Sequence, residues 1–154
     1  MAMTRYRTKL YVLALSTVIG IGGYFLIGLN RSGAEGMIDE KRRQVAQQEF
    51  DKRPEYFSEE SKRNILAQKI TVGMTPYEVH LAGGGFVYKV QADPKHWPPG
   101  ADPMRVIAAQ TDQPDDSKIT LTFRNTTQFQ TREPTTFRVE IRRGRVTEVV
   151  PVDK

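Results

Sequence analysis

The chain of 154 residues contains no cysteine, only two histidines and a single tryptophan. A disulfide framework, a thiolate metal site and lipid attachment through an N-terminal cysteine are therefore excluded. His80 and His96 are too far apart in the sequence to indicate a shared metal site, and Asp112, Asp115 and Asp116 fit a calcium loop only loosely. Since the sequence also lacks a nucleophile elbow and a phosphate loop, we expect no enzyme and no bound cofactor or metal.

Acidic residues are absent from the first 30 positions, and the stretch Leu10–Leu29 carries no charge at all. A helix of this length spans about 30 Å, the hydrocarbon thickness of a bilayer, so we expect one transmembrane helix at 10–29. The alternative is a signal peptide cleaved at 32–34, but the apolar run is longer than the usual signal-peptide core.

The basic residues beside this stretch predict its orientation. Arg5, Arg7 and Lys9 lie in the head, residues 1–9, whereas only Arg31 lies equally close on the other side. Because basic residues stay on the cytoplasmic side, we expect a cytoplasmic N-terminus and a C-terminal domain outside the cytoplasm. In a Gram-negative bacterium the protein would lie in the inner membrane with this domain in the periplasm.

Excess positive charge is small in the rest of the chain. The head holds three of the 23 basic residues, and the others nearly balance the 18 acidic ones. A nearly balanced domain attracts a phosphate backbone weakly, so we expect no nucleic-acid partner.

The expected membrane helix offers a contact for other membrane subunits as well as for the lipid bilayer. Ser16, Gly20 and Gly28 share one helical face, and small residues at this spacing let another helix approach closely. The alternative is that these positions carry no contact, because glycine is common in membrane helices.

Residues 30–57 are expected to form a polar, partly helical connector before a folded domain at 58–154. The segment from Met37 to Phe50 is compatible with a helix that ends before Pro54, but few of its positions are apolar. We expect a helix on or near the membrane surface that serves as a spacer or as a docking arm, and the sequence alone favours the spacer.

Two short helices are expected at the start of the domain. Ser58 can cap the first helix, at 58–70, which carries Ile65, Leu66 and Ile70 on its apolar edge. In the second, Thr75 and Glu78 form a capping box and the glycines at 83–85 end the helix.

Strands are expected where apolar residues alternate or follow a turn, at 86–91, 118–124, 135–142 and 145–150. The apolar run at 104–110 suggests one more strand. No connection is long enough for a helical crossover, so the sheet should be antiparallel. The fold class that we predict is therefore α+β: one N-terminal transmembrane helix, then a two-layer domain with two short helices against an antiparallel sheet.

The order of these elements resembles the SmpA/OmlA (BamE-like) family over residues of about 60–150. The similarity rests on Ile70, the run Val72-Gly73-Met74-Thr75, Glu78-Val79 with its glycine stop, and the last hairpin with Gly144. Members of that family are accessory lipoproteins of the outer-membrane β-barrel assembly machine, with two short helices against a three-stranded sheet. The resemblance implies this fold and the role of an accessory scaffold, although the family's lipid-bearing cysteine is absent here.

The proline-rich loop at 92–103 is the segment best suited to contact a partner. Trp97 is a rigid amphipathic side chain of the kind enriched at interfaces, with His96 before it and Pro98 and Pro99 after it. The prolines lower the entropy cost of holding the loop in one conformation. The alternative, equally weighted, is that Trp97 packs onto the sheet as part of the core.

Three functions remain open at this point. The first is a non-enzymatic, single-pass accessory subunit that stabilises a larger membrane complex, possibly photosynthetic or respiratory, through the membrane helix and the 92–103 loop. The second is an envelope-biogenesis factor related to outer-membrane β-barrel assembly. The third is a small ligand- or metal-binding periplasmic domain.

Overall fold

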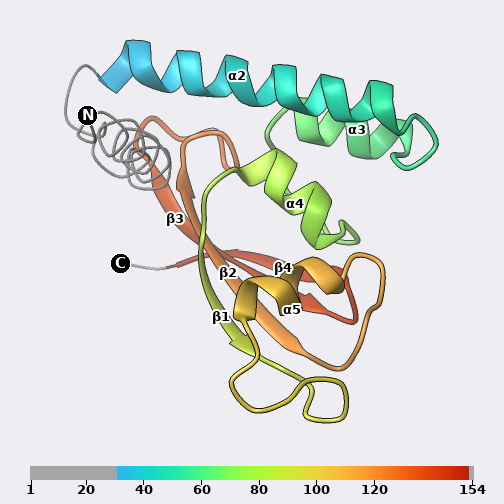
Figure 1. The fold of residues 1–154 in the computed structure, drawn as a ribbon. Helices are drawn as coiled ribbons and strands as arrows, with labels where there is room; N and C mark the ends of the chain where they lie inside the picture. The colour runs from blue at the N-terminus through green and yellow to red at the C-terminus, as the bar shows by residue number, and fades with distance from the viewer. Residues whose placement is uncertain (1–30, 153–154) are drawn as a thin grey trace, which may run out of the picture. The chain divides into compact units, whose positions relative to one another are not determined.

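Figure 1 shows the computed structural model of the chain, which describes residues 31–152. Residues Lys41–Lys154 group into one compact unit, and those up to Glu40 group separately. The helices are α2 (Arg31–Lys52), α3 (Glu59–Leu66), α4 (Pro76–Gly83) and α5 (Pro103–Ala109). The strands are β1 (Val87–Gln91), β2 (Lys118–Asn125), β3 (Thr135–Arg142) and β4 (Arg145–Pro151).

The four strands form one antiparallel sheet in the order β1-β2-β3-β4. Every second residue of β2 and β3 is buried, and these residues are Ile119, Leu121, Phe123, Phe137, Val139 and Ile141. The register places Leu121 opposite Val139 and Phe123 opposite Phe137, whose rings stack with centroids 5.4 Å apart. The alternation seen in the sequence therefore predicts the core face of the sheet correctly.

Capping interactions define the starts of the two short helices. Ser58 caps α3 by accepting a hydrogen bond from the backbone N–H of Ser61 at 3.0 Å. At α4 the Thr75 hydroxyl accepts from the Glu78 N–H at 3.2 Å, while a Glu78 carboxylate oxygen accepts from the Thr75 N–H at 2.7 Å. Gly84 ends α4 with a φ of +74°, a conformation that suits glycine. The starts of both helices and the end of α4 are therefore confirmed. The expected end of the first helix at 70 is wrong, because α3 ends at Leu66 and Gln68 has a φ of +55°, which does not continue a helix.

Helix α2 contributes to the core of the unit that begins at Lys41. Ala46 and Phe50 are 1% and 4% exposed and belong to the same apolar cluster as the inner face of the sheet. The Phe50 ring meets Phe57 edge-on with centroids 5.0 Å apart. The helix ends at Lys52, before Pro54, as expected. Its sparse apolar positions gave no indication that two of them would be buried.

The strand expected at 104–110 is wrong, because this segment is the helix α5. Asp102 caps the helix by accepting a hydrogen bond from the Met104 N–H at 3.0 Å, and Pro103 occupies the first turn. Val106, Ile107 and the cap residue Gln110 are buried, the spacing of a helical face rather than of a strand.

The fold class expected from the sequence is therefore wrong in the form stated above. The described residues do form an antiparallel α+β domain, but helices α2 and α5 accompany the two short helices that were expected. Among the described helices, none combines the length and the apolar character needed to cross a bilayer. The transmembrane helix expected at 10–29 lies outside the described residues.

Candidate interaction site

A groove of about 250 Å³ lies between α4, α5 and the turn that follows α2. Most of its lining residues are aromatic or apolar, and a few are polar or charged. The lining residues are Arg53, Tyr56, Pro76, Tyr77, His80, Phe86, Met104, Ile107, Ala108, Thr111 and Asp112. Met104 and Tyr56 are 44% and 36% exposed, so large apolar surfaces are open to solvent here.

Tyr77 fixes the wall formed by α4. Its hydroxyl donates a hydrogen bond of 2.6 Å to Oε2 of Glu49 on α2, and the Arg53 guanidinium lies 5.9 Å from its ring centroid. Burial and then the bond to Glu49 raise the pKa of Tyr77 to about 12. Hydrogen bonds from Lys52 and Tyr77 lower the pKa of Glu49. Tyr77 therefore keeps its proton at neutral pH and acts as a fixed structural group rather than as a base.

Aromatic contacts continue along the groove. Tyr56 meets Tyr77 edge-on with centroids 6.0 Å apart, and His80 meets Phe86 edge-on at 6.2 Å. His80 is exposed on α4, as expected of a histidine with no second ligand on its helix. Pre-ordered aromatic side chains beside an exposed methionine are typical of surfaces that bind polypeptide side chains.

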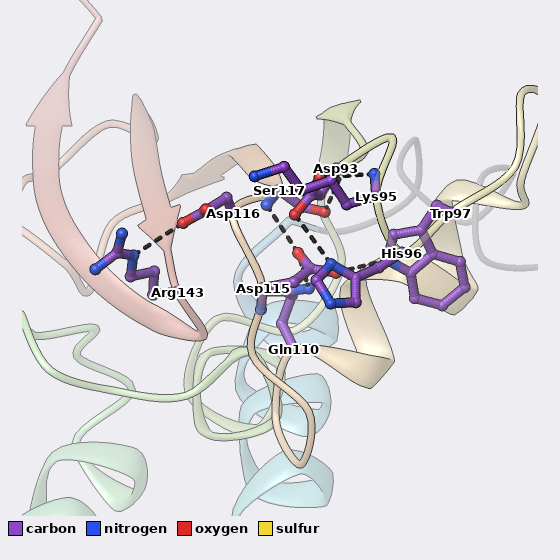
Figure 2. Close-up of polar contacts among 9 residues, drawn as sticks. All are labelled: Asp93, Lys95, His96, Trp97, Gln110, Asp115, Asp116, Ser117 and Arg143. Carbon is purple, nitrogen blue, oxygen red and sulfur yellow. Dashed lines mark hydrogen bonds and ion pairs between the residues drawn. The ribbon is translucent and has the colours of Figure 1, made fainter.

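The loop at 92–103 is tied to the segment that follows α5, as Figure 2 shows. Oδ1 of the buried Asp93 accepts a hydrogen bond from the Lys95 N–H at 2.9 Å. Its Oδ2 lies 3.0 Å from Nδ1 of His96. Its own N–H donates to the Ser117 hydroxyl at 2.9 Å. The bond from Lys95 and then the contact with His96 lower the pKa of Asp93.

Asp115 is the centre of this network. It accepts hydrogen bonds from Nε1 of Trp97 at 2.6 Å, from Nε2 of Gln110 at 2.8 Å and from the Ser117 N–H at 2.7 Å (Figure 2). Burial alone would raise the pKa of Asp115, but the bonds from Ser117, Trp97 and Gln110 outweigh it and lower the pKa. The carboxylate thus holds the loop, α5 and the start of β2 together.

Trp97 is neither fully exposed, as an interface residue would be, nor part of the core. Its ring is half-buried, its N–H is bonded to Asp115, and it does not belong to the apolar cluster found among the described residues. His96, Pro98 and Pro99 are exposed. The interaction role of these four residues stays a prediction. That of Ser16, Gly20 and Gly28 also stays a prediction, because these residues lie outside the described part of the chain.

The groove was not predicted from the sequence, because its residues come from four separate segments between 53 and 112. In the part of the chain that the structure describes, no three carboxylate or histidine side chains are grouped so as to hold a metal ion.

No family model, no curated protein and no solved structure matches this chain. The resemblance to the SmpA/OmlA family stays a prediction from a short motif.

Proposed function

We propose that this protein is a non-enzymatic accessory subunit that acts beside a membrane and binds a partner protein in the groove between α4 and α5. The observation that carries the proposal is the groove itself, with Met104 and Tyr56 exposed in its lining and the α4 wall fixed by the bond from Tyr77 to Glu49. A partner side chain entering such a surface finds apolar contact at little entropy cost, because the aromatic walls are already ordered.

The sequence supports the proposed location. The uncharged stretch at 10–29, with Arg5, Arg7 and Lys9 before it, would attach the chain to an inner membrane and leave the domain on the periplasmic side. The well-ordered loop at 92–103 adds a second surface for the partner, with Pro98 and Pro99 exposed.

Site-specific photo-crosslinking in the source cells tests the proposal. A photoreactive residue at Met104 should give one dominant adduct with a membrane protein, identified by mass spectrometry. Val72 is the matched control, since it is an exposed apolar residue outside the groove. Adducts of equal yield at the two positions, or none at Met104, would contradict a partner in the groove. Barrel-assembly components among the adducts would favour the envelope-biogenesis function.

A further inference from the structure

The sheet has a second face, which lies away from the buried core. Side chains of β2 and β3 that alternate with the core residues point to this face, and directly paired residues of β1 and β4 share it. Helix α5 contacts β1, and α4 contacts α5, on the core side (Figure 1). Val87 of β1 is 68% exposed on the second face, which we call the open face.

Positive charge dominates the open face. Its basic side chains are Lys89, Lys118, Arg124, Arg138, Arg142 and Arg145, and its acidic side chains are Glu140 and Glu148. Glu140 is already engaged: Arg138 Nε lies 3.0 Å from Oε1, Arg142 Nη2 lies 3.7 Å from Oε2, and the Thr120 hydroxyl lies within 3.1 Å of both oxygens. Apart from Glu140, Glu148 is the one acidic residue on this face among the described residues.

One row across the sheet concentrates this charge. The register places Lys118 directly opposite Arg142, and Arg142 directly opposite Arg145. Like charges at directly paired positions destabilise a sheet, and no acidic residue belongs to this row. Glu140 reaches Arg142 from the next row at 3.7 Å, and the Arg145 guanidinium donates to the Gly73 carbonyl at 3.1 Å, which leaves Lys118 and the outer part of the row open to an anion. In the adjoining turn Arg143 pairs with Asp116 at 2.9 Å, but both side chains are more than half exposed and their attraction is weak. An anion bound across the row would relieve the repulsion.

We propose that the open face binds the anionic headgroups of a phospholipid bilayer. An exposed sheet face suits an extended charged surface, and each basic side chain near such a surface contributes about 1 kcal/mol. The exposed Val87 lies on the same face and tolerates a headgroup environment. The inference rests on the proposed membrane location, because attachment through 10–29 would hold the domain close to the lipid and make these weak contacts effective.

The experiment uses the full chain in vesicles of phosphatidylcholine, alone or in equal parts with phosphatidylglycerol. Because the sequence has no cysteine, Val87→Cys supplies a unique thiol for a polarity-sensitive fluorophore on the open face. Met104→Cys on α5 is the control position. Only the label at 87 should shift to the blue, only in vesicles with phosphatidylglycerol, and the shift should fade at high salt.

Charge-neutralising variants locate the binding surface. Lys118→Gln with Arg142→Gln should weaken the response of the label at 87 about tenfold or more. Lys95→Gln with Arg105→Gln removes the same charge from exposed positions off the open face and should leave the response nearly unchanged. Equal losses in the two pairs would mean general charge attraction and would overturn the assignment to this face.

The outcomes separate this inference from the proposed function. If the chain does not float with the vesicles, both the membrane location and the open-face proposal are wrong. If it floats but the label at 87 gives the same emission in both lipids, only the open-face proposal is wrong. A stronger response to duplex DNA or to polyglutamate than to phosphatidylglycerol would also overturn it.

Discussion

The Asp115 carboxylate accepts hydrogen bonds from more separate segments than any other carboxylate described above. It receives the Trp97 indole N–H, the Gln110 amide and a backbone N–H, so three segments depend on one charged acceptor. A hydrogen bond to a charged group contributes about 1.5–3 kcal/mol, more than a neutral one. The residue thereby decides whether the 92–103 loop is held in place.

Replacing Asp115 by Asn should lower the free energy of unfolding by about 1–3 kcal/mol, since an amide turns a donor toward at least one of the three donors. Asp112→Asn, at an exposed position three residues earlier, should change it by less than about 0.5 kcal/mol. Urea denaturation followed by tryptophan fluorescence measures both. Equal stability of the two variants would show that the network does not hold the loop.

The same carboxylate predicts a dependence on pH. The pKa of Asp115, and that of Asp93, lie below the ordinary 3.8 in the folded chain, so the unfolded chain binds protons first as the pH falls. The stabilisation is thus complete above about pH 5 and is lost as the pH falls through the lowered values. Asp115→Asn should therefore melt with a weaker pH dependence between neutral and acid pH than the unaltered chain.

At the scale of elements, the hydrophobic pattern and the capping signals predicted most of the structure. Alternation placed β2 and β3, and the Thr75–Glu78 box placed α4, because local interactions decide both. The strand prediction for 104–110 was wrong because seven residues rich in apolar side chains fit a strand or a helix equally well. The Asp102-Pro103 pair carried the missing signal, a cap followed by a residue suited to the first helical turn.

A side chain joins the segment after α3 to the loop that follows β2, while backbone hydrogen bonds join Gly73 and Met74 of the same segment to Val146 of β4. The Gln128 amide oxygen accepts from the Ile70 N–H at 2.8 Å, and its amide nitrogen donates to the Ile70 carbonyl at 2.9 Å. The side-chain amide of Gln128 thus pairs with both backbone groups of Ile70, as a peptide group of a neighbouring strand would. Sequence patterns could not reveal this contact, because the two residues are 58 positions apart.

Gln128→Ala should therefore lower the free energy of unfolding by about 3 kcal/mol, because it leaves two buried backbone groups of Ile70 without their partners. Gln113→Ala, at an exposed glutamine, is the control and should change it by less than about 0.5 kcal/mol. Hydrogen exchange at the Ile70 amide gives a second measurement, since its protection should fall in the first variant alone. Unchanged protection would contradict the role of Gln128.

At the scale of the whole molecule, the boundary of the compact unit lies inside a helix. The unit begins at Lys41, so the last three turns of α2 belong with the sheet through Ala46 and Phe50. No sequence signal marks this division, because burial of two residues in a polar helix depends on surfaces supplied by distant segments. The groove could not be predicted from the sequence either, because its lining residues also come from distant segments.

Shortened chains test this division. Residues 41–154 should unfold in one cooperative transition, whereas residues 53–154, which lack Ala46, Glu49 and Phe50, should melt at a markedly lower temperature. The expected difference is about 3–5 kcal/mol, as for removal of a buried aromatic side chain. Calorimetry of the two chains measures it, and equal melting temperatures would show that α2 adds nothing to the core.

The order of the strands also has a consequence for how the chain reaches its fold. The hairpins β2–β3 and β3–β4 close across residues 126–134 and 143–144, whereas β1 meets β2 only after the whole of 92–117 has been arranged. Contacts between residues distant in sequence form late, since the entropy of a long loop must be lost before they stabilise anything. We therefore expect the three C-terminal strands to form the folding nucleus, with β1, which carries the exposed Val87, the last strand to join and the first to leave.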